Sequence, residues 1–520
     1  MTPKIRMFRY GEIVCQALGI PGETLHDRIS AVGVFIDSPC GGKGRCGKCL
    51  VRLSPDGEQV LACRTIIKGD MDVYLTDEID MKIAHEGIRR TLNVADRPYP
   101  PKRNKRLGVA IDVGTTTVVA HLIDIASGAR VATASGVNAQ MPYGADVITR
   151  VQYCAEKGHT RLTLLIREQI ESLIKHACTI SGERTRDIGY ISIAANTIMQ
   201  HLCAGYSPVG MGVAPFEPVS YFGDEHPAWD TLFTSRLTKI YYAPAISAYV
   251  GGDITSGLLA SDLEKTEGPA IYLDIGTNGE IVLKLGEKYY CCAAAAGPAF
   301  EGAEITMGMA AVVGAISQVR WNNGLKLSVI GEKPPVGICG SGLLDALALL
   351  IETGAVDESG RLLDPDEIEH NIAGHIGQHD GINVFWLTKK DKGVYLSAKD
   401  IRKLQLAKAA IAAGIETLLT QAEVKENDVN TFVLAGGFGS FMNHISAAKI
   451  GLFPKSFLPK TAAVGNTAGE GATLALCSAN ARMALEDISE RCEYIELSTS
   501  RIFNEAFIEH IMFPTQAGDD

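Results

Sequence analysis

Four cysteines near the amino terminus have the spacing of metal ligands. Cys40, Cys46 and Cys49 lie in one glycine-rich run, residues 39–49, and Cys63 follows 14 residues later. This C-x5-C-x2-C…C pattern allows one small loop to hold three thiolates around a metal centre while a later strand supplies the fourth. Glycines in such a loop let backbone N–H groups approach the sulfur atoms. The pattern therefore predicts a metal centre with four thiolate ligands.

The spacing favours a 2Fe-2S cluster over zinc, which remains the alternative. Zinc also takes four thiolates, but usually from two separated C-x2-C pairs, and the sequence contains one such pair. The run resembles the cluster loop of plant-type ferredoxins, except that its first gap has five residues instead of the common four. We expect Cys40, Cys46, Cys49 and Cys63 to bind the cluster and the chain to carry single electrons. The other nine cysteines lack this spacing and are expected to be small buried residues.

Two similar segments carry a second kind of chemistry. Residues 107–119 and 270–282 each read as a buried strand, an Asp-x-Gly-Thr turn and a second strand, with Asp112 and Asp274 at the strand ends. N–H groups and hydroxyls of such turns can cradle phosphate oxygens, while the carboxylate orients Mg²⁺ or its waters. The repeat predicts two related lobes that face each other across a cleft and clamp a polyphosphate.

A third segment adds a nucleoside side to this site. The apolar strand 431–435 runs into Gly436 and Gly437, where bare backbone can approach a nucleoside, and no P-loop sequence occurs. Asp112 and Asp274 are the expected organisers of magnesium and phosphate. Asp253 either caps a helix or lies across the cleft as a general base. The expected nucleotide contacts are Gly114, Thr115, Thr116, Gly276, Thr277, Asn278, Gly340, Ser341, Gly436 and Gly437. Glu301 is a weaker candidate for polarising a water, and His201 is expected to be a packed histidine.

The elements that must position these residues fall into two modules. Residues 1–78 form the cysteine module, with a short helix at 23–29 and strands near 50–53, 59–61 and 71–75. The charged, proline-rich residues 79–106 read as a linker. Residues 107–520 alternate strands with long helices such as 398–422, which is typical of an α/β domain with lobes at about 107–265 and 266–520.

Composition excludes several classes of protein. The chain of 520 residues has 60 acidic and 49 basic residues, a net charge of −11, which argues against a nucleic-acid-binding surface. No apolar run is long enough to span a membrane. Cysteines diluted over a long chain, without an apolar leader after Met1, favour a reducing cytoplasm.

The ordered motifs at 112–115, 274–277 and 435–437 resemble the phosphate-1, phosphate-2 and adenosine motifs of the actin, sugar kinase and Hsp70 ATPase superfamily. Further strings at 196–201, 249–254, 295–303, 337–345 and 464–468 resemble one branch, the reductive activators of corrinoid proteins. The resemblance implies an α/β and α+β multidomain fold, in which a β-grasp ferredoxin-like domain precedes a duplicated, ribonuclease-H-like, two-lobed ATPase. The short linker departs from longer members, which insert a further domain there.

The resemblance also implies an activity. An ATP-hydrolysing reductase would pass one electron from the cluster to the Co(II) corrinoid of a methyltransferase corrinoid protein and restore Co(I). The cofactors would be a 2Fe-2S cluster, ATP and Mg²⁺, and the partners a corrinoid protein and a low-potential electron donor, with a homodimer left open. A small-molecule kinase with an accessory cluster and a nucleotide-switched redox sensor are the alternatives.

Overall fold

The structure is a computed structural model that describes residues 2–9, 12–32, 34, 36, 42, 44, 49–55, 57, 59–75, 105–229, 239–390 and 393–514. Two of the expected cluster ligands, Cys40 and Cys46, and most of the expected linker at 79–106 lie outside these residues. Within the described ranges no helix is both long and apolar enough to cross a membrane.

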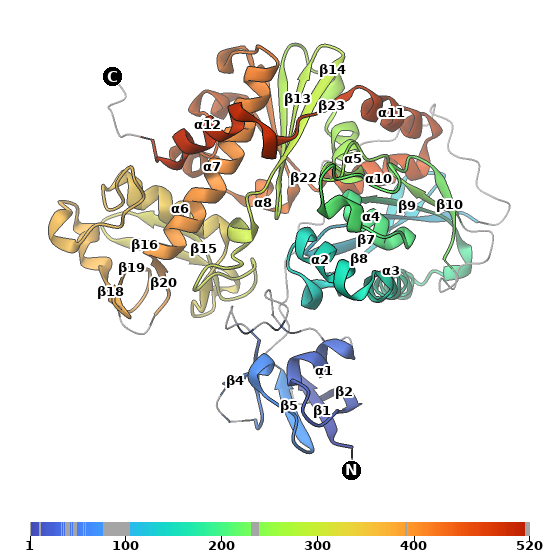
Figure 1. The fold of residues 1–520 in the computed structure, drawn as a ribbon, viewed down its shortest axis with the longest axis horizontal. Helices are drawn as coiled ribbons and strands as arrows, with labels where there is room; N and C mark the ends of the chain where they lie inside the picture. Colours follow the sequence, from blue (N-terminus) through green and yellow to red (C-terminus); the bar gives the residue numbers. More distant parts are fainter. Residues whose placement is uncertain are drawn as a thin grey trace.

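The amino-terminal residues form a five-stranded mixed sheet, drawn in blue in Figure 1. Its order is β2-β1-β5-β3-β4, with β1 parallel to β5 and the other neighbours antiparallel. The strands are β1 (Lys4–Arg9), β2 (Glu12–Leu18), β3 (Leu50–Arg52), β4 (Gln59–Leu61) and β5 (Met71–Leu75). The helix α1 (Leu25–Ala31) begins after the capping side chain of Thr24 and buries Leu25 and Ile29 against Ile5, Val51 and Val73. The strands expected near 50–53, 59–61 and 71–75 are confirmed, and the helix expected at 23–29 begins two residues later. The hairpin of β1 and β2 was not anticipated.

A six-stranded sheet follows, in the order β10-β11-β9-β6-β7-β8. Its strands are β6 (Leu107–Val113), β7 (Thr117–Asp124), β8 (Ala129–Val137), β9 (Ile188–Ala195), β10 (Glu225–Pro227) and β11 (Lys239–Tyr242). The helices of this part are α2 (Val147–Lys157), α3 (Thr160–Ser181), α4 (Thr197–Ala204) and α5 (Gly252–Ser261). The central strand β9 is buried along its whole length, which explains its unbroken run of small and apolar residues.

The second six-stranded sheet has the order β22-β21-β12-β13-β14-β23. Its strands are β12 (Ala270–Ile275), β13 (Gly279–Leu285), β14 (Lys288–Ala294), β21 (Thr431–Ala435), β22 (Thr461–Gly465) and β23 (Cys492–Tyr494). Its first strand β12 lies between β13 and β21, just as β6 lies between β7 and β9 in the first sheet. The orders β11-β9-β6-β7-β8 and β22-β21-β12-β13-β14 are therefore equivalent, and both are mixed α/β sheets.

Two small sheets, the first mixed and the second antiparallel, are inserted between β14 and β21. They contain β15 (Ala315–Trp321), β16 (Leu325–Val329) and β17 (Gly337–Ile338), and β18 (Ile376–His379), β19 (Ile382–Trp386) and β20 (Tyr395–Ser397). The helix α6 (Gly340–Glu352) lies between them in sequence. The helix expected at 398–422 is confirmed as α7 (Ala398–Gln421), which starts with a capping box between Ser397 and Asp400.

The remaining helices lie in the carboxyl-terminal part. They are α8 (Gly436–Phe441), α9 (His444–Lys449), α10 (Thr467–Cys477), α11 (Ala479–Glu490) and α12 (Arg501–Ile511). Helix α10 packs Ala468, Ala472 and Leu476 on the first sheet, although it follows the second sheet in the chain. Helix α5 precedes the second sheet and packs Ile254 and Leu258 on it. The two helices also pack on each other, which ties the two sheets together between the lobes (Figure 1).

Candidate functional site

A cavity of about 320 Å³ lies where the β6–β7 and β12–β13 turns approach each other. Its size lies within the range of small-molecule pockets. The cavity brings together every residue that the sequence assigned to catalysis or nucleotide binding. These are Asp112, Gly114, Thr115, Thr116, Asp253, Asp274, Gly276, Thr277, Asn278, Gly340, Ser341, Gly436 and Gly437.

The first turn is fixed from behind by hydrogen bonds to its backbone. The Gly114 N–H donates to Thr117 O at 2.9 Å, and Asn138 Nδ2 donates to Gly114 O at 2.8 Å. The fully buried Arg150 donates from Nη2 to Thr115 O at 2.5 Å. These bonds hold the backbone of the turn, and the side chain of Thr116 lines the cavity.

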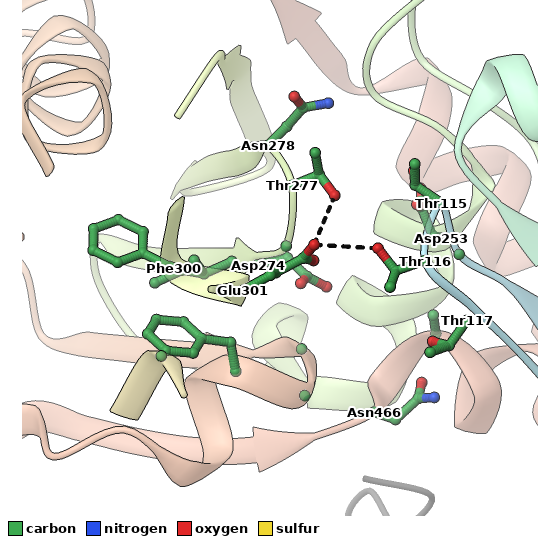
Figure 2. A pocket seen from close by; sticks show the side chains of 18 of the residues that line it. Thr115, Thr116, Thr117, Asp253, Asp274, Thr277, Asn278, Phe300, Glu301 and Asn466 are labelled. Carbon is green, nitrogen blue, oxygen red and sulfur yellow. Dashed lines mark hydrogen bonds between the residues drawn. The ribbon is translucent and has the colours of Figure 1, made fainter. Parts of the chain in front are cut away.

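The second turn is also closed by a backbone hydrogen bond. The Gly276 N–H donates to Asn278 O at 2.9 Å and closes the turn between β12 and β13. Thr277, whose side chain is buried, points its hydroxyl into the cavity opposite Thr116 (Figure 2). The two lobes thus present one hydroxyl each to a common space.

Glu301 occupies that space. It ends the short 3-10 helix Pro298–Glu301, and its Oε2 accepts hydrogen bonds from Thr116 Oγ1 and Thr277 Oγ1, both at 3.2 Å (Figure 2). Burial raises the pKa of Glu301, and the hydrogen bonds from the two threonines oppose that rise. One carboxylate oxygen therefore joins the turns of both lobes.

Three aspartates and a second glutamate converge on the same cavity. Burial, followed by the charge of Asp112, raises the pKa of Asp274 to about 7. Burial, followed by the charges of Asp274 and Asp112, raises the pKa of Asp253 to about 7. The pKa of Asp112 rises to about 6 through burial, although a hydrogen bond from Asn466 Nδ2 at 2.7 Å counteracts the change. Glu280 lies directly across the β12–β13 ladder from Asp274, and burial raises its pKa well above the usual value.

None of the described residues that line the cavity is Lys, Arg or His. The positive potential that an anionic ligand would require instead comes from helix starts. Helices α5, α6 and α10 each have a residue in their first turn that lines the cavity, namely Asp253, Gly340 and Thr467. The free N–H groups and the positive dipole ends of helices are suited to phosphate. The cavity therefore combines acidic side chains with electropositive backbone.

The residues after β21 form the side of the cavity expected to face a nucleoside. Gly436 has φ 81°, and a Cβ on it would lie 2.4 Å from Asp274 Oδ1, so any larger residue would displace that carboxylate. Phe438 stacks on Phe300 with ring centroids 5.5 Å apart, and Phe441 lines the cavity while its side chain stays 63% exposed. These flat apolar surfaces lie next to Gly436 and Gly437.

The structure decides two open questions about single residues. Asp253 lies in the first turn of α5 and faces the cavity, whereas the capping position is held by Gly251. His201 is fully buried, with its Nδ1 2.7 Å from Thr197 O and its Nε2 accepting from Val219 N at 2.9 Å. The expectation of a packed histidine is confirmed.

Two of the four expected cluster cysteines lie in the described residues. Cys49 is buried, Cys63 is partly buried, and the Cys63 N–H donates to Cys49 Sγ at 3.5 Å. Gly42, in the same loop, has φ 79°, and a Cβ on it would lie 2.5 Å from the ring of His26. An N–H directed at a cysteine sulfur and glycines with positive φ, such as Gly42, are features of cluster-binding sites. Among the described residues no three acidic, histidine or cysteine side chains are arranged to hold a bare metal ion.

Sequence reasoning left several cavity residues unassigned. Glu280 is adjacent to the recognised turn, but only the β12–β13 register places it opposite Asp274. Asn466 caps α10 through Oδ1 and bonds Asp112 through Nδ2, and its role depends on a contact 354 residues away in the chain. An Asn before a helical segment is a visible capping signal, but the contact with Asp112 leaves no trace in the local sequence.

The paired sheets and facing turns are those of an ATPase-type fold of the actin and sugar kinase class. Residues 268–519 match the family model of the C-terminal domain of RACo, the ASKHA domain, and residues 107–266 match that of the RACo middle region. Because these matches cover most of the chain, it belongs to the RACo family, the reductive activators of corrinoid proteins.

Individual relatives extend the likeness over almost the whole chain. The corrinoid activation enzyme RamQ of Eubacterium limosum is 30% identical, over 94% of this chain and 95% of its own length. The reductase of the Co(II) methylated amine-specific corrinoid protein of Methanosarcina barkeri is 23% identical, over 79% of this chain and 77% of its own. A solved reductive activator for corrinoid, iron-sulfur protein is 28% identical, covers 98% of both chains and superposes with a TM-score of 0.71.

Proposed function

We propose that this chain is an ATP-dependent reductive activator, which transfers one electron to the Co(II) corrinoid of a methyltransferase corrinoid protein and restores Co(I). The observation that carries the proposal is the cavity, where two hydroxyl-bearing turns and three helix starts meet in a chain that also holds the cysteine loop. The names of RamQ and of the Methanosarcina barkeri reductase, which refer to corrinoid activation and to a Co(II) corrinoid protein, support the choice of substrate.

Residues 1–78 are proposed as a β-grasp, ferredoxin-like domain in which Cys40, Cys46, Cys49 and Cys63 hold a 2Fe-2S cluster. The mixed five-stranded sheet and the Cys63 N–H bond to Cys49 Sγ support this assignment. A bound cluster of this type supplies a one-electron couple near −400 mV. The chain itself must hold the thiolates, exclude water with the core behind Cys49, and present the loop to the corrinoid partner.

Residues 107–520 are proposed as a duplicated, ribonuclease-H-like ATPase, preceded by a linker at 79–106. The equivalent strand orders of the two large sheets support the duplication. Asp112 and Asp274 would orient Mg²⁺ through its waters, because Mg²⁺ in nucleotide sites keeps several waters and takes few direct protein ligands. The two turns would bind the phosphates, with Gly436 and Gly437 beside the nucleoside.

ATP is proposed to drive conformational change and not to supply the electron. For a one-electron couple, about 59 mV corresponds to ~1.4 kcal/mol, so ~10 kcal/mol from nucleotide binding and hydrolysis can shift an equilibrium by roughly 0.4 V. Movement of the lobes on ATP would change docking with the corrinoid protein and the ligation of its cobalt. Helices α5 and α10, which pack on each other between the lobes, are placed to transmit such a movement.

The test is anaerobic absorption spectroscopy of several corrinoid proteins with catalytic amounts of this chain, a low-potential reductant, and ATP or none. We expect Co(I) to form faster with ATP. Cys49→Ala should stop the reaction by removing a cluster ligand, Asp274→Ala by disabling the nucleotide site, and Cys477→Ser should leave it unchanged. If no corrinoid protein is reduced while a sugar or other metabolite is phosphorylated, with Asp253 as base, the kinase alternative replaces the proposal. ATP binding without electron delivery would favour the redox sensor.

A further inference from the structure

The position of Glu301 has a consequence for how a nucleotide enters the cavity. Its Oε2 accepts one hydrogen bond from each lobe, through Thr116 of the β6–β7 turn and Thr277 of the β12–β13 turn. Figure 2 shows both bonds converging on this single oxygen, in the space between the turns. A phosphate oxygen at this point would be bound in the same way, by one hydroxyl from each side.

The two hydroxyls cannot serve both acceptors at once. Each threonine hydroxyl has one hydrogen to donate, and in this structure each is within bonding distance of Glu301. A phosphate group that took these bonds would also bring negative charge next to the carboxylate, and no Lys, Arg or His lies among the described lining residues to neutralise the pair. Phosphate and the Glu301 carboxylate are therefore mutually exclusive partners of the threonines.

We propose that Glu301 is a built-in phosphate mimic, which joins the two lobes when no nucleotide is present and is displaced when a nucleotide phosphate binds Thr116 and Thr277. The inference rests on the proposed nucleotide site and assigns Glu301 a role in it that differs from polarising a water. Glu301 is thus a positioning residue, which acts through the two threonines and lowers the affinity for nucleotide.

The packing around Glu301 links its displacement to the rest of the site. The preceding residue, Phe300, stacks on Phe438 beside the Gly436 turn. The carbonyl of Phe300 lies so close to Gly340 that a Cβ there would meet it at 1.8 Å. The 3-10 helix Pro298–Glu301 therefore packs directly on the start of α6 and on the Phe438 ring, and a shift towards either would move them. Displacement of the carboxylate would therefore change the packing on the nucleoside side of the cavity as well as the contact between the lobes.

The experiment compares nucleotide affinities of wild type and Glu301→Gln by isothermal titration calorimetry with Mg²⁺. The amide keeps the size of the side chain but removes its charge, and a neutral acceptor binds hydroxyls more weakly than a carboxylate. We expect a non-hydrolysable ATP analogue to bind about tenfold more tightly to the variant, a change of ~1.4 kcal/mol. Adenosine, which does not reach the threonines, should bind both proteins equally. Glu304→Gln makes the same change in charge three residues on, at an exposed position outside the cavity, and should leave both affinities unaltered.

Each outcome separates this inference from the proposed function. If wild type does not bind the analogue at all, the nucleotide site itself is wrong. If wild type binds but Glu301→Gln binds with equal or lower affinity, the mimic is refuted, and a loss of hydrolysis at unchanged affinity would make Glu301 a water-polarising residue instead. An equal gain for adenosine would also refute it, because the effect would then not depend on phosphate. Glu301→Ala, checked for folding by its melting temperature, should show the same phosphate-dependent gain.

Discussion

Replacing Asp274 with Asn should make the nucleotide-free protein more stable at pH 8 while disabling its proposed site. Asp274 shares the cavity with Asp112 and Asp253, and the pKa values of all three are raised, to about 7, 6 and 7. Burial is the main cause for each, and mutual repulsion adds to it for Asp274 and Asp253. Charging these groups therefore disfavours the folded state, and an amide of the same shape removes one of the charges.

The sign and size of the effect follow from linkage. A carboxyl group whose pKa is higher in the folded state binds protons more tightly there. The stability that Asp274 contributes is therefore fully present below its unfolded-state pKa of 3.8 and is lost as pH rises through its folded-state pKa of about 7. Between pH 5 and pH 7 the loss in the free energy of unfolding corresponds to roughly two pH units, or ~2.7 kcal/mol at ~1.36 kcal/mol per unit. Water in the cavity screens the charge, which makes this value an upper limit.

The assay is differential scanning calorimetry of both proteins, without nucleotide or magnesium, at pH 5 and pH 8. At about 2.1 cal/mol/K per residue, the unfolding entropy of residues 107–519 is ~0.9 kcal/mol/K, so ~2.7 kcal/mol corresponds to a relative shift in Tm of about 3 °C. The variant should melt at a higher temperature than wild type at pH 8. The Tm difference between the two proteins should be larger at pH 8 than at pH 5, by up to about 3 °C.

The matched control is Asp124→Asn, which should behave in the opposite way. Burial of Asp124 is outweighed by hydrogen bonds from Ser127 and by the Arg106 charge, so that its pKa is lowered. Its stability contribution is present above its unfolded pKa and is lost on acidification, and the variant should melt below wild type at pH 8. If the Tm difference between Asp274→Asn and wild type is the same at pH 5 and pH 8, Asp274 has no raised pKa and the reasoning about the acidic cavity fails.

Two further predictions test the cysteine loop and the contact between α5 and α10. Wild type purified anaerobically should contain about two irons and two acid-labile sulfides per chain by chemical analysis. Cys49→Ala should lose the iron and sulfide, whereas the control Cys15→Ala, in the same sheet, should keep them. Stoichiometric zinc in wild type would contradict the assignment. Gly471→Ala should lower the Tm by about 1–3 °C, since its Cβ would meet the backbone oxygen of Ser256 on α5 at 2.2 Å and overpacking costs ~1–3 kcal/mol. The control is Gly374→Ala, because a Cβ at Gly374 meets no atom within 4 Å. An equal Tm in both variants would show that α5 and α10 have room to separate.

The parts of the fold that the sequence predicted are those with strong local signals. Strand β5 and the long helix α7 were located within a residue or two, because alternating or helical spacing of apolar side chains persists through each of them. The short strands β3 and β4 were located equally closely. The hairpin of β1 and β2 was not anticipated, although Lys4–Met7 alternates exposed charged residues with buried apolar ones, which is a strand pattern. The pairing of β1 with β5 spans more than sixty residues and leaves no local signal. The small sheets between β14 and β21 were also not anticipated, because strand formation there depends on tertiary pairing.

The same distinction separates the recognised site residues from the missed ones. The Asp-x-Gly-Thr turns are local motifs, whose chemistry is visible in four consecutive residues, and the cavity contains both. Glu301 was only a weak candidate because its importance lies in two contacts, with residues 185 positions before it and 24 positions before it. Asn466 and Glu280 likewise depend on which strands are neighbours. Local sequence specified the groups that we propose to bind a ligand, and long-range packing specified the contacts of Glu301, Asn466 and Glu280 with them.

The crossed arrangement of α5 and α10 explains how a ligand in the cavity can act on the whole molecule. Asp253 lies in the first turn of α5, which packs on the second sheet, while Thr467 begins α10, which packs on the first. The two lobes are also joined at the cavity by Glu301, through one hydroxyl from each. A ligand that broke the Glu301 bridge and drew the starts of both helices towards its phosphates would act on both lobes, because α10 packs on the first sheet and α5 contacts both the second sheet and β9 of the first. The coupling therefore depends on the packing of Gly471 against Ser256, and a variant with an intact cavity but a looser contact there should bind nucleotide without moving the lobes.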